Sequence, residues 1–440
     1  MIYSAIELNK TDEPKYVQLY RSIRDAISEG RIESGEKLPS IRKLSSDMGI
    51  SRSTVENAYA QLEVEGFIMS RPQSGYYACA AAHSAFSGEQ LTPQSESPKQ
   101  NYRYDFRSGS IDRMALDIEH WRRKVRAVLS KQENMLSYGD AQGEITLREQ
   151  LCRYAYNVRS VVTRAENIVV GAGIQPLLSI LCGLLDDAET VSMLSSFNKA
   201  ERIFSDFRMK ISYSMDSSAS LLFVDPSDWE NGEVMPASKR VELIEYAKSN
   251  GQYIIEDDYN GELRASSRPV PSIQGMSREQ VIYIGSFSKL LMPSVRLSYM
   301  VLPDRLAEKY RNVKNEYNQT ASKAEQLALA EYMRTGELEK QLRRSRKLYS
   351  SKCRLMLSAL SGAVGKEQIT VRETTLMICV RVKGEIKKIK ANAEKYGICL
   401  DGKQAGDTAV IEMSYSGISS QDIPEAAKLV IRSIEENEER

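Results

Sequence analysis

The sequence predicts an α/β protein with two folded parts, a small helical domain ending in a β-hairpin and a larger domain built on a sheet. Apolar residues recur at helical spacing over residues 14 to 62, and residues 67 to 77 alternate toward a turn and back. Residues 79 to 104 are rich in Ser, Gln, Glu and Pro and bury too little to fold alone. We therefore expect domains at residues 1–78 and 105–440, joined by a linker at 79–104.

Composition narrows the classes of function. The chain has 440 residues, enough for two or three domains, and its formal charge of +1 gives no global attraction to nucleic acid or membrane. Any DNA contact must come from a local patch. Two histidines and six scattered cysteines without a C-x-x-C pair argue against a metal site, so no metal is expected. Without a leader-like segment or an apolar run of membrane length, the expectation is a soluble, cytoplasmic protein with no membrane contact.

The first domain shows the pattern of three helices and a wing. A first helix is expected from Pro14 to Gly30, and a second over residues 40 to 48 with Gly49 as its stop. Ser51 or Ser53 caps a third helix, and Ser53 with Glu56 forms an S-x-x-E capping box. Residues 67 to 77 then give a two-stranded hairpin.

The third helix carries the candidate DNA-reading surface. Its apolar residues leave Arg52, Ser53, Thr54 and Asn57 outward near its beginning, where the second helix of a helix-turn-helix reaches base edges. Acidic and basic residues nearly balance here, so position matters more than net charge. The basic residues that cluster on the DNA-facing elements are Lys37, Arg42, Lys43, Arg52 and Arg71. A helical bundle with a hairpin and no DNA role is the alternative that the pattern alone leaves open.

In the larger domain, the stretch from Ser286 to Tyr299 contains the main chemical signal. The apolar run 281–284 predicts a buried strand, which puts Lys289 where a strand's carboxyl end opens into a crevice. A lysine there can form a Schiff base with an aldehyde, and Arg296, seven residues later, can bind a phosphate. Ser286 and Ser288 add hydroxyl donors for the same anion. Together these residues suggest pyridoxal phosphate (PLP), whereas a lone S-x-K is usually an ordinary solvated loop.

Two further elements agree with a phosphate-bearing ligand. Residues 168–170 predict a strand, 171–173 a glycine turn, and residues from Ile174 to Leu184 a helix, whose first N–H groups can hold an anion. Residues 254–263 predict a strand that ends in carboxylates. The helical region that follows is expected as two helices, residues 304–335 and 337–359, the second with a basic run at 343–347 that is interpreted as a solvated face.

These motifs resemble a known family. L-P-S-x-R, S-R-x-T-V and E-x-E-G resemble the GntR family, and S-F-S-K-x-x-x-P-x-x-R with E-D-D-Y-x-x-E resembles fold-type-I aminotransferases. In this order, over nearly all of the chain, they are similar to the MocR subfamily of GntR-type transcription regulators. The fold class implied is a winged helix-turn-helix followed by a fold-type-I, PLP-dependent aminotransferase-like domain.

The resemblance assigns roles at the cofactor site. It implies that Lys289 binds PLP, that Asp257 keeps the pyridine nitrogen protonated and that Tyr259 contacts the phenolic oxygen. Phe197 is expected to stack on the ring. Tyr138 is expected to reach the phosphate of a neighbouring subunit, which implies a homodimer. The expected phosphate contacts are Ala172, Gly173, Ile174, Ser286, Ser288 and Arg296.

It also assigns roles at DNA. Arg42 and Arg52 resemble phosphate and base contacts, and Gly75 resembles the tip of the wing. The remaining residues of the expected operator-binding set are Lys37, Ser40, Ser51, Ser53, Thr54 and Arg71.

Three departures from the family are expected to change the ligand site. Residues 193–197 keep the aromatic Phe197 but lack the acidic residue and the proline of relatives. Residues 225–232 are shorter and more acidic. Glu412 stands where relatives usually carry an arginine that binds an α-carboxylate, so a carboxylate ligand would meet repulsion there.

Three functions follow from the sequence. The favoured one is a PLP-dependent regulator of transcription that binds operator DNA and senses a small effector, an amine, an amino acid or PLP itself. The second is a working aminotransferase with a DNA-binding domain, in which Lys289 moves the α-proton. The third is a degenerate dimerisation module without cofactor. Catalytic turnover is the less expected outcome.

Overall fold

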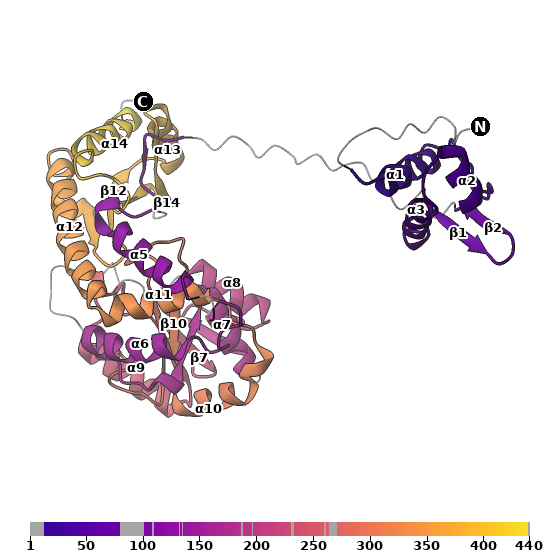
Figure 1. Cartoon of the computed structure of the whole chain (residues 1–440). Helices are drawn as coiled ribbons and strands as arrows, with labels where there is room; N and C mark the ends of the chain where they lie inside the picture. Colours follow the sequence, from indigo (N-terminus) through magenta and orange to yellow (C-terminus); the bar gives the residue numbers. More distant parts are fainter. Residues whose placement is uncertain are drawn as a thin grey trace. The chain divides into compact units, whose positions relative to one another are not determined.

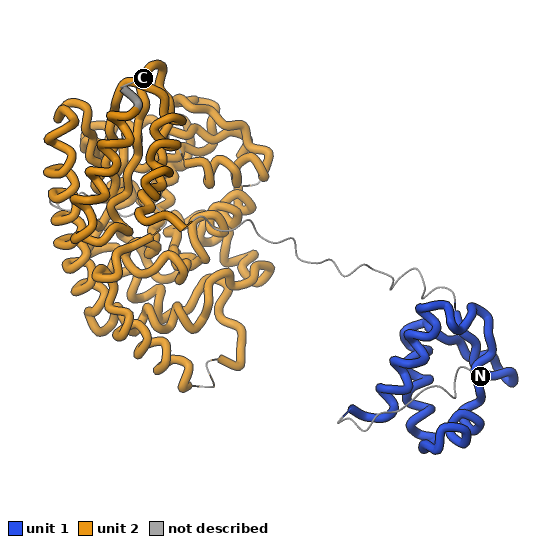
Figure 2. Tube along the Cα trace, turned by 90° about the horizontal axis from the view of Figure 1, so that it is seen from above, with its two compact units in different colours: residues 1–99 blue, residues 100–440 orange. Residues whose placement is uncertain are grey.

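The computed structural model describes residues 13–79, 101–107, 110–131, 133, 135–185, 188–195, 197–229, 233–258, 261–263 and 271–438. Figure 1 labels those helices and strands for which there is room. The chain divides into two compact units, residues 1–99 and 100–440, which Figure 2 colours separately. None of the helices within the described ranges is long and apolar enough to cross a membrane.

The described residues of the first unit form three helices and a hairpin around one small core. The helices are α1 (Lys15–Ser28), α2 (Ile41–Met48) and α3 (Arg52–Val64), and the strands are β1 (Ile68–Arg71) and β2 (Gly75–Ala78). Helices α1 and α2 both pack on α3, with Leu19, Leu44 and Tyr59 fully buried between them. The helical spacing in the sequence therefore marked the buried faces correctly.

The helix ends follow ordinary capping chemistry, with one correction to the sequence prediction. Gly49 ends α2 in the left-handed conformation (φ 62°), which glycine adopts without strain. At the start of α3 the Ser51 hydroxyl accepts a hydrogen bond from the Thr54 N–H at 3.2 Å. Ser51 is thus the N-cap, and the predicted capping box of Ser53 with Glu56 is wrong because both residues lie inside the helix.

The hairpin also shifts one predicted position. β1 and β2 pair antiparallel with Arg71 opposite Gly75, so residues 72–74 form the turn. Gln73 lies within this turn with φ 60°. Gly75 (φ 109°) therefore begins the returning strand. The prediction that Gly75 forms the tip of the wing is wrong.

The second unit is built on a seven-stranded sheet in the order β4-β10-β9-β8-β7-β5-β6. β10 is antiparallel to β4 and β9, while the other neighbouring pairs are parallel. Most of its strands are buried on both faces, which explains their continuous apolar runs. The strands are β4 (Ile168–Gly171), β5 (Thr190–Met193), β6 (Lys210–Ser212), β7 (Leu221–Val224), β8 (Tyr253–Asp258), β9 (Val281–Ser286) and β10 (Ser298–Val301).

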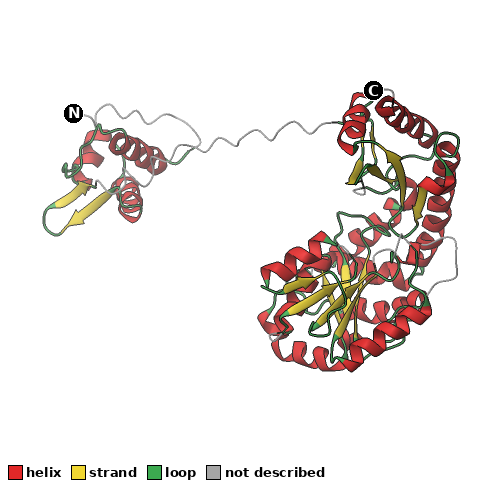
Figure 3. Cartoon of the chain, turned by 180° about the vertical axis from the view of Figure 1, so that it is seen from behind, coloured by secondary structure: helices red, strands yellow, loops and turns green. Residues whose placement is uncertain are grey.

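Helices cover both faces of this sheet, as Figure 3 shows. On one face the core is shared with α7 (Ile174–Leu184), α8 (Asn198–Asp206) and α10 (Asp304–Val313). On the opposite face it is shared with α6 (Ile145–Arg159), α9 (Ala237–Ser249) and α11 (Lys323–Arg334). Helix α5 (Ile118–Leu129) packs against α11.

A smaller layer completes the unit. The long helix α12 (Glu337–Leu360) leads to an antiparallel sheet in the order β11-β12-β15-β14. Its strands are β11 (Ile369–Arg372), β12 (Met377–Lys383), β14 (Asp401–Ala405) and β15 (Thr408–Ser414), packed with α13 (Ile386–Lys395) and α14 (Ile423–Glu438). β3 (Tyr104–Asp105) pairs in parallel with β13 (Ile398–Cys399). The 3-10 helices are η2 (Arg113–Ala115), η4 (Ala165–Asn167), η6 (Gly261–Leu263), η7 (Lys314–Glu316) and η8 (Lys366–Gln368).

The predicted helix over residues 304–335 is wrong, because the chain breaks it into α10 and α11. After η7 the backbone becomes extended at Tyr317 (φ −98°, ψ 146°), and α11 begins only at Lys323. Within the break, the Thr320 hydroxyl accepts a hydrogen bond from the Ala172 N–H at 3.2 Å. The break therefore places a polar side chain against the turn between β4 and α7.

Candidate functional site

Lys289 lies at the carboxyl edge of the seven-stranded sheet, just after β9. Its side chain is almost completely buried, with only 2% of the residue exposed. The ammonium donates to the Ser110 carbonyl at 3.2 Å and to the Ser416 hydroxyl at 3.1 Å. Burial, and then the nearby Lys352 ammonium, lower the pKa of Lys289 to about 8. With this pKa, roughly a tenth of the amine is neutral, and therefore nucleophilic, at pH 7, far more than for an ordinary lysine.

A second buried lysine supports this arrangement and was not found from the sequence. Lys352 on α12 is fully buried, and its ammonium contacts Asp112 Oδ2 at 2.7 Å and the Ser416 carbonyl at 3.0 Å. Ser416 therefore contacts both lysines, through its hydroxyl and its carbonyl. A signal was available, because Lys352 continues the buried face of α12 between Tyr349 and Met356.

Asp257 is the carboxylate on β8 that is available to a ligand. It pairs with Ile284 and lies on the sheet face covered by α7 and α8, and only 8% of it is exposed. Burial, and then the Asp258 carboxylate, raise the pKa of Asp257 to about 7. Among the described residues, no hydrogen bond to the Asp257 side chain forms. A cation placed beside it would stabilise its charged form.

The two neighbours of Asp257 are already used inside the fold. Glu256 accepts the backbone N–H groups of Ile273 at 2.8 Å and Gln274 at 2.9 Å. Asp258 pairs with the buried guanidinium of Arg159, whose Nη2 lies 3.0 Å from Oδ1. Strand alternation puts both on the face opposite Asp257. Within the described part of the chain, Glu256 and Asp258 thus have structural partners, and Asp257 accepts no hydrogen bond.

The glycine turn and Arg296 meet at the same edge. In the sheet register, Ser298 on β10 lies opposite both Gly171 on β4 and Ser286 on β9. The turn after Gly171, the loop after Ser286 and the segment before Ser298, which contains Arg296, are therefore neighbours. A Cβ atom on Gly173 would lie 2.3 Å from Arg296 Nη2, so only glycine admits the guanidinium there. Arg296 itself has φ 53°, a conformation that costs a non-glycine residue roughly 1–3 kcal/mol and that concentrates at functional sites.

These residues form a site suited to an anion. Ala172 and Gly173 precede Ile174, the first residue of α7, where backbone N–H groups and the helix dipole favour negative charge. The side-chain oxygens of Ser286 and Ser288 are 3.2 Å apart at the end of β9. With the Arg296 guanidinium beside Gly173, the edge offers charge and hydrogen-bond donors together.

The other predicted cofactor contacts are placed less directly. Phe197, at the N-cap of α8, stacks on Phe223 with 6.5 Å between ring centroids, and it packs against the core on the same sheet face as Asp257. Tyr138 is fully exposed within this chain. Tyr259 lies outside the described residues.

The predicted DNA contacts lie on the surface of α2, α3 and the hairpin. Two of the hydroxyls act as helix caps: Ser40 accepts from the Lys43 N–H at 3.3 Å, and Ser51 caps α3. The hairpin holds two cations on one ring, with Lys37 Nζ 5.9 Å and Arg71 Cζ 4.5 Å from the Tyr77 centroid. The exposed members of the set are Lys37, Ser40, Arg42, Ser51, Arg52, Ser53 and Arg71, and the partly buried ones are Thr54 and Gly75.

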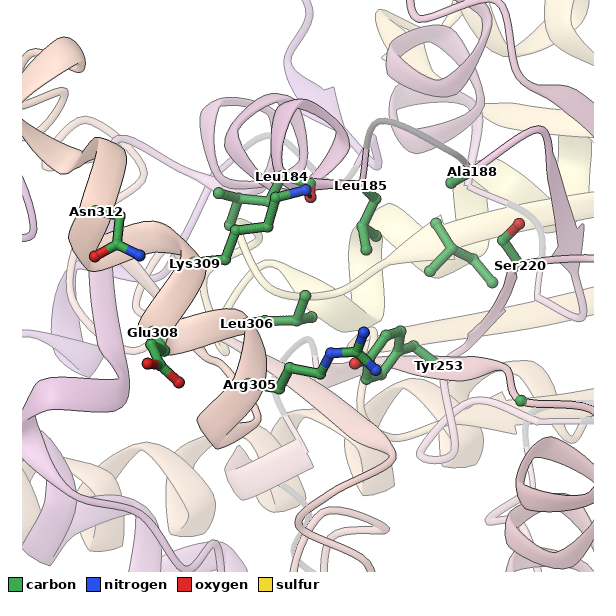
Figure 4. A pocket seen from close by; sticks show the side chains of 12 residues that line it. Leu184, Leu185, Ala188, Ser220, Tyr253, Arg305, Leu306, Glu308, Lys309 and Asn312 are labelled. Carbon is green, nitrogen blue, oxygen red and sulfur yellow. Dashed lines mark hydrogen bonds between the residues drawn. The ribbon is translucent and has the colours of Figure 1, made fainter.

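A pocket of about 490 Å³ lies elsewhere, between α10 and the first residues of β7 and β8 (Figure 4). In this view the Arg305 guanidinium lies beside the Tyr253 ring. The Lys309 ammonium hydrogen-bonds the Leu184 carbonyl. Ligands of open α/β sheets bind at the carboxyl ends of strands, and this pocket is at the opposite edge from Lys289. The candidate functional site is therefore the edge with Lys289.

Comparison with known proteins agrees with both units. Residues 15–77 match the bacterial regulatory proteins of the gntR family, and residues 230–428 match the aminotransferase class I and II family. The crystal structure of Pyrococcus horikoshii kynurenine aminotransferase has a TM-score of 0.67 and 22% identity, over 77% of this chain and 92% of that one. This similarity shows the fold of the second unit.

Relatives cover both units at once. The uncharacterized HTH-type transcriptional regulator YdeL of Bacillus subtilis is 35% identical over 96% of this chain and 97% of its own. The probable rhizopine catabolism regulatory protein MocR of Rhizobium meliloti is 27% identical over 79% of this chain and 77% of its own. A GntR-type DNA-binding domain followed by a fold-type-I aminotransferase-like domain defines a class of transcription regulators. The chain belongs to the MocR subfamily of that class.

Proposed function

We propose that this regulator binds PLP through Lys289, works in the cytoplasm as a homodimer and changes its affinity for operator DNA when a small effector binds. The effector is an amine, an amino acid or PLP itself. The supporting observation is that three features lie at one sheet edge: a buried lysine, a buried carboxylate that accepts no hydrogen bond from the described residues, and an anion site.

The three groups correspond to the three reactive parts of PLP. Lys289 can take the aldehyde, Asp257 can pair with the pyridine nitrogen, and Arg296 with the turn 171–174 can hold the phosphate. When bound, PLP supplies an electrophilic carbon and an electron sink for amino compounds. The chain's own contribution is to keep the amine of Lys289 partly neutral and to orient it through Ser110 and Ser416.

DNA binding is assigned to the first domain, residues 1–78, tethered by residues 79–104 to the effector domain at 105–440. The exposed residues of α3 and the cations beside Tyr77 are the proposed contacts to bases and phosphates. Tyr138 is proposed to act in the partner's cofactor site, because its ring is completely exposed in one chain. Linkage between effector and operator then operates through the dimer.

A working aminotransferase is the second candidate. It is favoured by Lys289, since a lysine whose pKa is about 8 can act as a general base. It is disfavoured by the acidic Glu412 on β15. Steady turnover of an amino donor with a keto acid would support it. A single equilibrium shift of the cofactor spectrum without turnover supports the sensor.

The direct test is the absorbance of the purified protein. We expect a yellow cofactor band that is absent from Lys289→Ala and unchanged in Lys340→Ala, an exposed lysine on α12. The band should shift with an effector, and the same effector should change the affinity for operator DNA. A colourless wild-type protein that also fails to bind added PLP would leave only the dimerisation module.

A further inference from the structure

The face of the small sheet that looks toward Lys289 carries a carboxylate. Glu412 and Ser414 are two residues apart on β15 and therefore project from the same face, about 7 Å apart. The Ser414 hydroxyl is 2.9 Å from that of Ser416, and Ser416 accepts from Lys289 at 3.1 Å. Glu412 thus lies on the sheet face whose next residue, Ser414, contacts the Lys289 environment through Ser416.

The loop after β7 adds a second carboxylate to the same place. Among the residues that the structure describes, the buried Asp228 Oδ1 has no hydrogen-bond partner, although Arg372 Nε lies 3.8 Å away. That distance exceeds a hydrogen bond. The pKa of Asp228 is raised, mainly by burial; the charge of Arg372 lowers it and that of Glu412 raises it. Asp228, Arg372 and Glu412 are therefore close enough for their charges to interact. Buried polar atoms in native folds are nearly always hydrogen-bonded, so this oxygen is a candidate acceptor for a ligand.

The acidic row continues to Asp257. The Asp225 side chain accepts the N–H groups of Ser227 at 2.8 Å and Asp228 at 3.1 Å, which fixes the loop. Burial, followed by the charge of Asp257, raises the pKa of Asp225 well above its ordinary value. The row of four carboxylates consists of Asp257, Asp225, Asp228 and Glu412.

The cations that face this acidic row neutralise it poorly. Arg372 lies 3.8 Å from Asp228, and Lys403 Nζ lies 3.8 Å from Glu412 Oε1. The Lys403 side chain is 68% exposed, and an exposed pair of this kind stabilises little. Among the described residues, the cations that face Asp228 and Glu412 each lie at 3.8 Å, beyond hydrogen-bond distance, which leaves room for a closer cationic partner.

We propose that the effector is a diamine, or another amine with a second cationic group and no carboxylate. One amine lies at Lys289, and the second pairs with Asp228 and Glu412. This inference rests on the proposed function, because it names the ligand of the same site. An ammonium gives both carboxylates a charge-assisted hydrogen-bond partner, whereas a carboxylate at that end would be repelled.

Three probes of similar length test the charge at the far end. Putrescine carries a second ammonium, γ-aminobutyrate carries a carboxylate, and n-butylamine carries neither. Binding to the full-length PLP-bound protein is measured by calorimetry, together with the shift of the cofactor band. We expect putrescine to bind at least about tenfold more tightly than n-butylamine, and γ-aminobutyrate more weakly than either. Equal affinities, or preference for γ-aminobutyrate, would overturn the proposal.

Variants of Glu412 test the residue itself. Glu412→Gln keeps the shape and should remove most of the preference for putrescine, and Glu412→Arg should reverse it toward γ-aminobutyrate. Glu435→Gln, an exposed position on α14, is the matched control and should bind like the wild type. An unchanged preference in Glu412→Gln contradicts the assignment even if Glu412→Arg fails to fold.

The same measurements distinguish failure of the diamine proposal from failure of the proposed function. A protein with a normal cofactor band that responds to all three amines alike retains the proposed function and loses only the diamine. A protein that binds no PLP loses both.

Discussion

Replacing Gly173 by alanine is the sharpest perturbation of the cofactor site. The backbone at Gly173 has φ 102°, where an alanine costs roughly 1–3 kcal/mol, and the new Cβ would lie 2.3 Å from Arg296 Nη2. The guanidinium must move away from the turn. Loss of one charge-assisted hydrogen bond to phosphate, about 1.5–3 kcal/mol, weakens PLP binding by about 10- to 150-fold.

The assay is equilibrium titration of cofactor-free protein with PLP, with urea unfolding measured in parallel. Gly251→Ala is the matched control, since Gly251 has φ 66° but nothing within 4 Å of an added Cβ. It should lose stability without losing affinity for PLP. If Gly173→Ala binds PLP as tightly as the wild type, Arg296 and this turn do not hold the phosphate.

Three further predictions follow from the same geometry. Because only the neutral amine attacks an aldehyde, attachment of PLP should accelerate about tenfold per pH unit up to the Lys289 pKa of about 8 and level off above it; stopped-flow rates that do not vary with pH would contradict this. Arg159→Met leaves Asp258 buried without its cation and should lower the free energy of unfolding by about 3–5 kcal/mol, so a loss under about 1 kcal/mol in urea unfolding would be inconsistent with the pair. Arg71→Ala should weaken binding to all DNA sequences alike and reduce the salt slope of binding by about one, and an unchanged slope would remove Arg71 from the phosphate contacts.

Local patterns in the sequence predicted the parts of the fold that depend on neighbours along the chain. The apolar runs at 168–170 and 281–284 predicted strands correctly, because strands that are buried on both faces are apolar throughout. Gly49 ends α2 because it adopts the left-handed conformation. The placement of Lys289 after a strand follows from the same local logic. The break between α10 and α11 has no comparable local signal, since Thr320 is positioned by the distant turn at Ala172.

The chemistry around Lys289 depends on contacts across the chain, which sequence patterns do not give. Ser110 and Ser416 are 306 positions apart yet hydrogen-bond to each other and to the same lysine. Lys352 lies beside them because the fold pairs it with Asp112. The choice of Asp257 among three successive acidic residues came from resemblance, and the sheet supplies the physical reason by turning the other two to the opposite face.

The central claim is that one lysine holds the cofactor. Reduction of the PLP-incubated protein with borohydride, followed by digestion and mass spectrometry, tests it directly. We expect a single modified peptide with the phosphopyridoxyl mass on Lys289. The same mass on Lys352 or another lysine, or no modified peptide after saturation with PLP, would contradict it.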